Sequence, residues 1–175
     1  GAKMGWERPL WFAPPGIPPV LEYSFGRQNW FPYAAAEHRA AREAVAVFDQ
    51  TSFAKLLVQG RDAERVLQRL CANDVGGAPG RVVYTGMLNA RGGYESDLTV
   101  TRLAEDAYLL ITGTAQATRD ADWIRRNLPD RAQVTLTDVT SAWSVLGVMG
   151  PRARDLLGLV AVGAVMVYSA SAIQA

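Results

Sequence analysis

An aspartate and two threonines occupy alternate positions in the segment ESDLTVT, and their types and spacing could do chemistry. Side chains alternate along a strand, so Asp97, Thr99 and Thr101 share one face. Leu98 and Val100 then share the other face, which is suited to a core. A carboxylate beside hydroxyls can hydrogen-bond a small molecule. The residues alone leave two interpretations open: the polar face lies in water, or it lines a pocket.

Other reactive groups are few. Cys71 and His38 are single in the sequence, which excludes a disulfide framework and a two-histidine metal site, and we predict no metal site. Cys71 lies in the apolar helical stretch VLQRLCAND, where a buried thiol is favoured over a Cys–His dyad. The glycines between residues 76 and 80 lack both GK[ST] and GxGxxG spacing, so they indicate a turn rather than a phosphate loop.

Composition narrows the class of protein. The 175 residues suffice for one domain with a core, and 18 basic residues nearly balance 17 acidic ones, so no nucleic-acid surface is predicted. The apolar run LLGLVAVGAVMVY is shorter than the ~20 residues that a membrane-spanning helix needs. The opening GAKMGWERPLWFAPPG has no apolar signal region, and we expect a cytoplasmic protein without a membrane partner.

The polar segment must be positioned by a strand, a tight turn and a second strand, because NARGG supplies residues that tolerate positive φ. Along the rest of the chain, the spacing of apolar residues is helical in some segments and strand-like in others. This pattern predicts an α+β fold with antiparallel sheets and flanking helices. Helices are expected within residues 33–49, 61–74 and 118–130 and from Pro151, with strands within 52–60, 81–88, 107–113, 132–140 and 143–150.

Three segments are expected along the chain. Residues 1–33 are rich in proline and aromatics and predict an irregular arm, packed on the domain or on a neighbouring one. Residues 34–157 form the domain. Residues 158–175 form an apolar tail without charge, in which the helix from Pro151 continues a short way and the residues after about Tyr168 are poorly ordered.

Two stretches resemble each other, LLVQGRDAERVLQRL and SVLGVMGPRARDLLGL. Each reads as a strand, a glycine, a short polar turn and a helix, with Gly60 and Gly150 in the same place. Chance recurrence in an α+β fold and internal duplication both account for this pattern.

Four blocks carry a resemblance to a known family: GAKMGWERPLWF, EHRAAREAVAVFDQTSFAKLLVQGRDAERVLQRLCANDV, YTGMLNARGGYESDLTVTRLAEDAYLLITG and GVMGPRARDLL. In order and spacing they resemble the folate-binding domain of the aminomethyltransferases, the T-protein family of the glycine cleavage system. They are more similar to the version that follows the flavin domain in sarcosine and dimethylglycine dehydrogenases and in the pyruvate dehydrogenase phosphatase regulatory subunit. The resemblance covers roughly residues 1–157 and implies a domain that is incomplete at its C-terminal end.

The resemblance implies the roles of five residues. Asp97 matches an aspartate that reaches the folate and is the expected catalytic residue. Tyr84 matches a residue that lines the pterin pocket, and Phe53 is expected in its wall. Thr99 and Thr101, on the same face as Asp97, are expected to border it. The T-protein usually has a second acid directly before the aspartate, whereas this sequence has serine there, as in the dehydrogenase-like branch.

The implied function is that of the tetrahydrofolate-binding part of a dimethylglycine or sarcosine dehydrogenase-like protein or an aminomethyltransferase. It would accept a one-carbon unit from an amine-derived iminium. The expected partners are folate, a small amine-derived donor and a flavin-binding domain or subunit. FAD would lie only on that separate or missing upstream domain, so this chain alone is not expected to oxidise an amine. The alternatives are a regulatory or interaction module, docking through its aromatic arm, and an inactive gene fragment.

Overall fold

The computed structural model describes residues 1–161, so the expectation about residues after Tyr168 lies outside the described residues. The chain divides into two compact units. Unit 1 consists of residue 1, residues 7–49 and the chain from residue 146 onward, and unit 2 consists of residues 2–6 and 50–145. The expected division into arm, domain and tail stays a prediction. Within residues 1–161, no helix has the length and apolar character needed to cross a bilayer.

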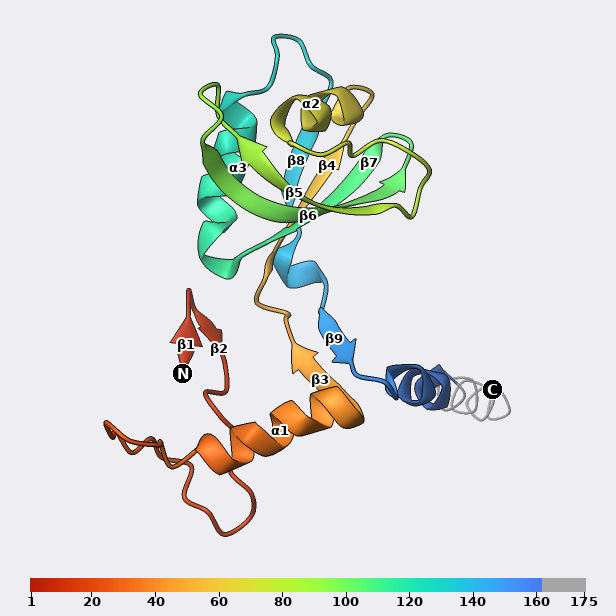
Figure 1. Ribbon diagram of the computed structural model, residues 1–175. Coiled ribbons are helices and arrows are strands. Elements are labelled where there is room, and N and C mark those ends of the chain that lie inside the picture. Colours follow the sequence, from red (N-terminus) through yellow and green to blue (C-terminus); the bar gives the residue numbers. More distant parts are fainter. Residues whose placement is uncertain (162–175) are drawn as a thin grey trace, which may run out of the picture. The chain divides into compact units, whose positions relative to one another are not determined.

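Unit 2 is built on a five-stranded sheet with the order β5-β6-β7-β4-β8, in which neighbouring strands are antiparallel (Figure 1). Its strands are β4 (Ala54–Gln59), β5 (Val82–Leu88), β6 (Tyr94–Ala104), β7 (Ala107–Thr112) and β8 (Thr135–Asp138). Its helices are α2 (Ala63–Leu70), η1 (Thr114–Gln116), α3 (Ala117–Arg126) and η2 (Thr140–Ala142). The expected α+β class with antiparallel sheets and flanking helices is confirmed.

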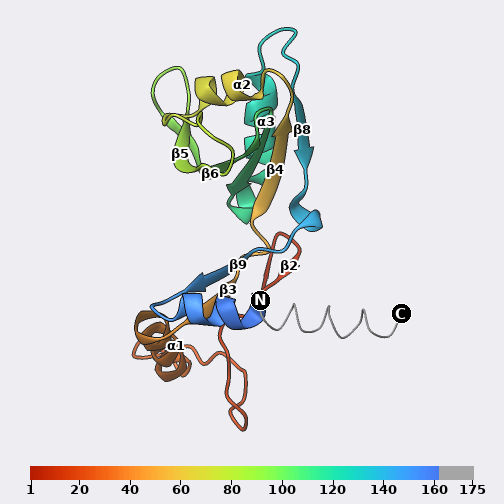
Figure 2. The ribbon, with the colours of Figure 1, turned by 90° about the vertical axis from the view of Figure 1, so that its right-hand side faces the viewer.

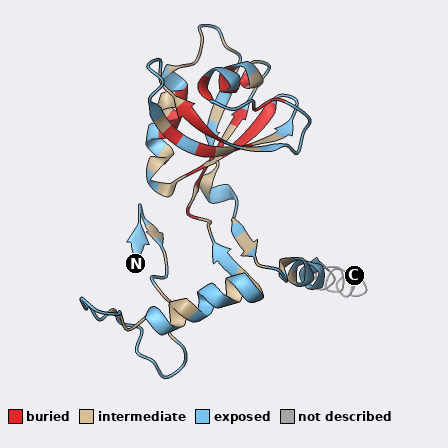
Figure 3. Cartoon of the chain, in the orientation of Figure 1, coloured by how far each residue is buried: buried red, intermediate tan, exposed pale blue. Residues whose placement is uncertain are grey.

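The core of unit 2 lies between one face of the sheet and the helices α2 and α3 (Figure 3). Leu98 and Val100 of β6 are buried in it, as the alternation predicted, so the intervening polar residues project from the opposite face. On α2 the buried side chains recur at helical spacing and form one apolar face. These side chains are Ala63, Val66, Leu67 and Leu70.

The hairpin between β5 and β6 closes through Asn89, as the turn residues indicated. Its side-chain Oδ1 accepts hydrogen bonds from the N–H groups of Arg91 and Gly93, at 3.0 and 2.9 Å. Gly92 has a φ of +76°, which glycine adopts without steric cost. The turn fixes the register in which β5 faces β6.

Unit 1 contains the helix α1 (Phe31–Glu43) and the antiparallel strands β3 (Ala46–Asp49) and β9 (Leu146–Met149), which lie side by side in Figure 2. The strand β2 (Trp6–Glu7) pairs with β1 (Ala2–Lys3). Residues 153–161 are helical, so a helix does follow Pro151. The expectation that residues 1–33 are irregular is wrong at both of their ends, because β1 pairs with β2 and α1 begins at Phe31. Pro32 lies in its first turn, where the missing N–H costs little.

The repeated glycines adopt the same backbone geometry. Gly60 and Gly150 have φ values of +133° and +125°. A Cβ at either position would clash with a backbone carbonyl oxygen, that of Gln133 or that of Ala44. In both turns the residue two positions later donates its N–H to that carbonyl, and the residue three positions later donates to the glycine carbonyl. The similarity in sequence therefore corresponds to a repeated turn between strand and helix.

Candidate functional site

A cavity of about 380 Å³ lies in unit 2, on the side of the sheet where the polar residues of β6 project. Strands β5, β6 and β7 and the segment after β7 contribute to its wall, together with both ends of the 50–145 segment. The lining residues are Gln50, Phe53, Tyr84, Asp97, Leu98, Thr99, Ile111, Thr112, Gly113, Gln116 and Val145. Asp97 is the one formally charged side chain among them, so the cavity favours ligands with donors or positive charge.

Strand register brings the two most distinctive groups together. Tyr84 lies opposite Thr99 and Gly86 lies opposite Asp97, so Tyr84 and Asp97 are diagonal neighbours on one face. The Tyr84 hydroxyl donates a hydrogen bond of 2.7 Å to Asp97 Oδ2. A side chain at Gly86 would meet the ring of Tyr94, which occupies that space instead. The ring of Tyr94 therefore lies over Gly86, the strand partner of Asp97.

Asp97 changes the titration of Tyr84. The hydrogen bond from the phenol to the carboxylate, together with the negative charge of Asp97, raises the pKa of Tyr84 above its ordinary value of 10.0. The phenol therefore stays protonated at neutral pH and keeps donating. Tyr84 as a residue is 65% exposed, which leaves its ring available to a flat ligand.

Four of the five expected site residues border the same cavity: Phe53, Tyr84, Asp97 and Thr99. Thr101 lies on the same face of β6, opposite Val82, but does not line the cavity. The sequence missed other wall residues. Ile111 is the β7 partner of Thr99, a pairing that depends on the register between two strands. Nothing local in the sequence indicated Gln116.

The two ends of the 50–145 segment of unit 2 also meet at the cavity. Gln50 donates its N–H to the carbonyl of Val145 at 2.8 Å, and Val145 donates its own N–H to the hydroxyl of Thr51 at 3.2 Å. These residues are far apart in the sequence, so their meeting at the wall required the three-dimensional structure. Ser96, where the T-protein usually has an acid, is buried on the helix side of the sheet. That departure therefore does not change the charge of the cavity wall.

The other reactive groups do not form a second chemical centre. Burial raises the pKa of the Cys71 thiol to about 12, so the thiolate needed for nucleophilic attack is disfavoured at neutral pH. Among residues 1–161, no three His, Cys, Asp or Glu side chains gather as a metal site would require. The glycines after Asp74 form a loop closed by that carboxylate, which accepts from Gly76 N–H and pairs with Arg81.

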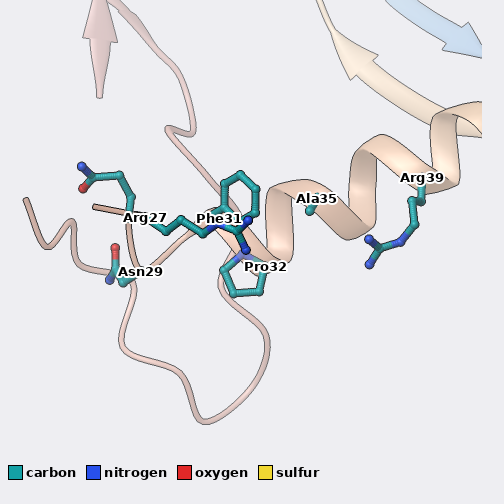
Figure 4. Close-up of a pocket in the computed structure, with 7 residues that line it drawn as sticks. Arg27, Asn29, Phe31, Pro32, Ala35 and Arg39 are labelled. Carbon is teal, nitrogen blue, oxygen red and sulfur yellow. The ribbon is translucent and has the colours of Figure 1, made fainter. Parts of the chain in front are cut away.

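A second cavity, of about 420 Å³, lies in unit 1 at the start of α1 (Figure 4). The guanidinium of Arg27 lies over the ring of Phe31, 4.8 Å from its centre, and Arg39 extends from the helix further along. None of the lining residues is acidic and none is paired with a catalytic partner. The cavity in unit 2 is therefore the candidate site.

Comparison with protein families gives one match that spans nearly the whole chain. The model described as the GCVT N-terminal domain matches residues 1–170. The structure is similar to the glycine cleavage system aminomethyltransferase T from Bartonella henselae, with a TM-score of 0.64 and 25% identity. That similarity covers 70% of this chain and 34% of the other.

Several curated proteins are similar in sequence. The chain is 41% identical to 4-methylaminobutanoate oxidase (formaldehyde-forming) from Paenarthrobacter nicotinovorans over 90% of its length. It is 38% identical to the mitochondrial pyruvate dehydrogenase phosphatase regulatory subunit of Mus musculus, over 89%, and 35% identical to the mitochondrial dimethylglycine dehydrogenase of Rattus norvegicus, over 90%. It spans only 19% of the first relative and 18% of each of the others.

Proposed function

Because the chain belongs to the GCVT N-terminal domain family, we propose that its unit 2 cavity binds tetrahydrofolate and serves one-carbon transfer. The single observation that carries this proposal is the Tyr84–Asp97 pair in a cavity of about 380 Å³. The one-carbon unit would come from an amine-derived iminium, the chemistry suggested by relatives named for amine oxidation and dehydrogenation.

The wall residues fit a reduced pterin. The exposed ring of Tyr84 offers a surface on which a flat heterocycle can stack, and Phe53 supplies an apolar wall. Asp97 offers a carboxylate oxygen that is not used by Tyr84, and a carboxylate is the natural acceptor for ring N–H groups. Thr99 adds a hydroxyl on the same strand. Thr101 lies beyond the cavity and would affect only the outer part of a longer ligand.

Asp97 is the proposed catalytic residue. When bound, tetrahydrofolate supplies the amine nitrogen that accepts the one-carbon unit. Asp97 would hydrogen-bond and orient that amine, and its negative charge would stabilise positive charge on the donor. The neutral Tyr84 hydroxyl fixes the carboxylate in place, because it donates to one of its two oxygens.

Oxidation of an amine would need a flavin, which we place on another domain or subunit. Relatives of several times this length carry names of amine oxidases and dehydrogenases, and this chain matches about a fifth of each. The aromatic and polar lining of the unit 2 cavity supports a reduced pterin as its ligand, and we assign FAD and the amine substrate to that other domain or subunit.

Calorimetric titration with tetrahydrofolate tests the proposal. Asp97→Ala should raise the dissociation constant at least tenfold, because it removes a hydrogen bond to a charged group. Glu105→Ala is the matched control, since Glu105 is an exposed carboxylate in the turn between β6 and β7 and does not line the cavity. Equal affinity of the wild type and Asp97→Ala would remove Asp97 from the site. No binding by the wild type would overturn the function.

A regulatory module is the second candidate. The 38% identity to a regulatory subunit supports it, together with the aromatic side chains Tyr23 and Phe25, which protrude from unit 1. Such a module would assemble through these rings without binding folate. Light scattering on the wild type and a Tyr23→Ser, Phe25→Ser variant tests this. Loss of an oligomer in the variant would support docking, and a monomer in both would count against it.

A further inference from the structure

A buried polar cluster lies behind the wall of the unit 2 cavity. It joins Ser96 of β6, Thr112 of β7 and Asp120 of α3, which are 4%, 3% and 2% exposed. The fourth member, Gln116 of η1, reaches the same hydroxyls. Thr112 and Gln116 both line the cavity, and Gln116 is the less buried of the two, so its amide is the part of the cluster most open to a ligand.

The carboxylate of Asp120 uses both hydroxyl protons. Thr112 Oγ1 lies 2.6 Å and Ser96 Oγ lies 2.8 Å from Asp120 Oδ2. Each hydroxyl carries a single proton, and an ionised carboxylate can only accept. Bonds to a charged acceptor are short and stronger than neutral ones, as these distances indicate. Neither hydroxyl has a proton left for another acceptor.

The oxygen of the Gln116 amide then faces two hydroxyl oxygens and receives no proton from either of them. Gln116 Oε1 lies 2.8 Å from Ser96 Oγ and 3.2 Å from Thr112 Oγ1, although both hydroxyl protons point to Asp120. An amide NH₂ in that position resolves the mismatch, because its two protons match the two free hydroxyl oxygens. The oxygen and nitrogen of an amide have nearly the same shape, and the hydrogen-bond network decides between them.

We infer that Gln116 donates its NH₂ to Ser96 and Thr112 and turns its carbonyl oxygen to the cavity, where it selects ligands with N–H donors. Every proton of the cluster is then used once: two from the amide to the hydroxyl oxygens, and two from the hydroxyls to Asp120. The cavity wall gains a neutral acceptor in addition to the carboxylate of Asp97.

This arrangement makes Gln116 a specificity-determining residue for the reduced form of the cofactor. Tetrahydrofolate carries N–H groups at ring nitrogens where folic acid carries lone pairs. A wall of fixed acceptors favours the N–H groups and repels the lone pairs. This part of the inference rests on the proposed function, whereas the orientation of the amide does not.

The orientation is tested on the full chain without ligand by NMR. The side-chain NH₂ signals of Gln116 are assigned by their loss in Gln116→Met. We expect these protons to exchange slowly with water and to show contacts to the Thr112 methyl group. The NH₂ of Gln50, which lines the same cavity, is the internal reference. Fast exchange of the Gln116 protons without such contacts would place the carbonyl on the cluster and overturn the inference.

Selectivity is tested by titrating tetrahydrofolate and folic acid into the wild type, Gln116→Met and the control Gln59→Met, an exposed glutamine of β4 that does not line the cavity. The ratio of the two affinities should fall about tenfold in Gln116→Met, near the upper value of one neutral hydrogen bond, and stay unchanged in the control. An unchanged ratio in Gln116→Met would remove its role in specificity. A wild type that binds neither compound would overturn both this role and the proposed function, while the NMR result would still decide the orientation.

Discussion

The charge of the candidate site is set by a single carboxylate and the phenol that donates to it. Asp97 is exposed to the cavity, and its partner Tyr84 holds it by a 2.7 Å hydrogen bond. Ionisation of Tyr84 would remove that donor and place two negative charges next to each other. The pair therefore works as one unit, in which the neutral phenol maintains the position of the carboxylate.

Asp97→Asn should lower the pKa of Tyr84, because the neutral amide removes both the charged acceptor and the negative charge. The pKa of Tyr84 is raised in the folded chain, so the pair stabilises the fold below the unfolded value near 10. That contribution is lost as the pH rises through the folded value. Phenolate absorbance during alkaline titration measures the change. Asp106→Asn, an exposed carboxylate in the β6–β7 turn, should leave the titration as it is.

Thr112→Val should destabilise the fold by about 2 kcal/mol, because it removes a hydrogen bond to a buried charged group at constant side-chain size. Thr137→Val on the exposed face of β8 is the matched control and should change stability by less than about 0.5 kcal/mol. Urea denaturation measures both. Equal stability of the two variants would mean that the Thr112–Asp120 bond contributes nothing.

At the scale of elements, positions that depend on strand period could be predicted and positions that depend on contacts between elements could not. Alternation along β6 placed Asp97 and Thr99 on one face, and the resemblance implied that this face borders a pocket. Tyr84 needed the resemblance, since nothing in its own strand marks it. Gln116 follows β7 in a 3₁₀ turn whose direction depends on how α3 packs on the sheet. No local pattern indicates that its amide reaches Ser96 on another strand.

The repeated turn depends on glycine for two reasons, which can be separated. Gly60 has positive φ and no room for a Cβ, whereas Gly92 in the β5–β6 hairpin has positive φ and open space. Gly92→Ala should cost about 1 kcal/mol from backbone strain alone. Gly60→Ala should cost a further ~1–3 kcal/mol, because the methyl group meets the carbonyl of Gln133. Thermal unfolding compares the two, and equal costs would contradict the steric argument.

At the scale of the whole molecule, burial is concentrated in one unit. Among residues 1–161, every fully buried side chain belongs to unit 2, while the residues of unit 1 are half-buried or exposed. Apolar burial is the main source of folding free energy. The β4–β7 pair of unit 2 and the β3–β9 pair of unit 1 are both antiparallel. They therefore differ in burial and not in their pattern of hydrogen bonds.

Hydrogen exchange should therefore separate the two units. Amides of the β4–β7 pair, such as Val58, should exchange only through global unfolding. Amides of the β3–β9 pair, such as Val47, should exchange much faster, because the side chains around them are exposed. Mass spectrometry of peptides from both pairs measures this. Equal protection of the two pairs would show that unit 1 has a source of stability other than its own packing.

Gln50 and Val145 lie close together, so the order of the strands along the chain could be changed without changing the five-stranded sheet of unit 2. The backbone nitrogen of Gln50 lies 2.8 Å from the carbonyl oxygen of Val145, so a short glycine linker could join these two residues. New termini could then be made between Asp130 and Arg131, which lie in an exposed loop. Such a circular permutant retains every strand pairing of the sheet. We expect it to fold with a native circular dichroism spectrum. The same property would let the 50–145 segment be inserted into a surface loop of a host protein, with its sheet and its cavity wall kept together.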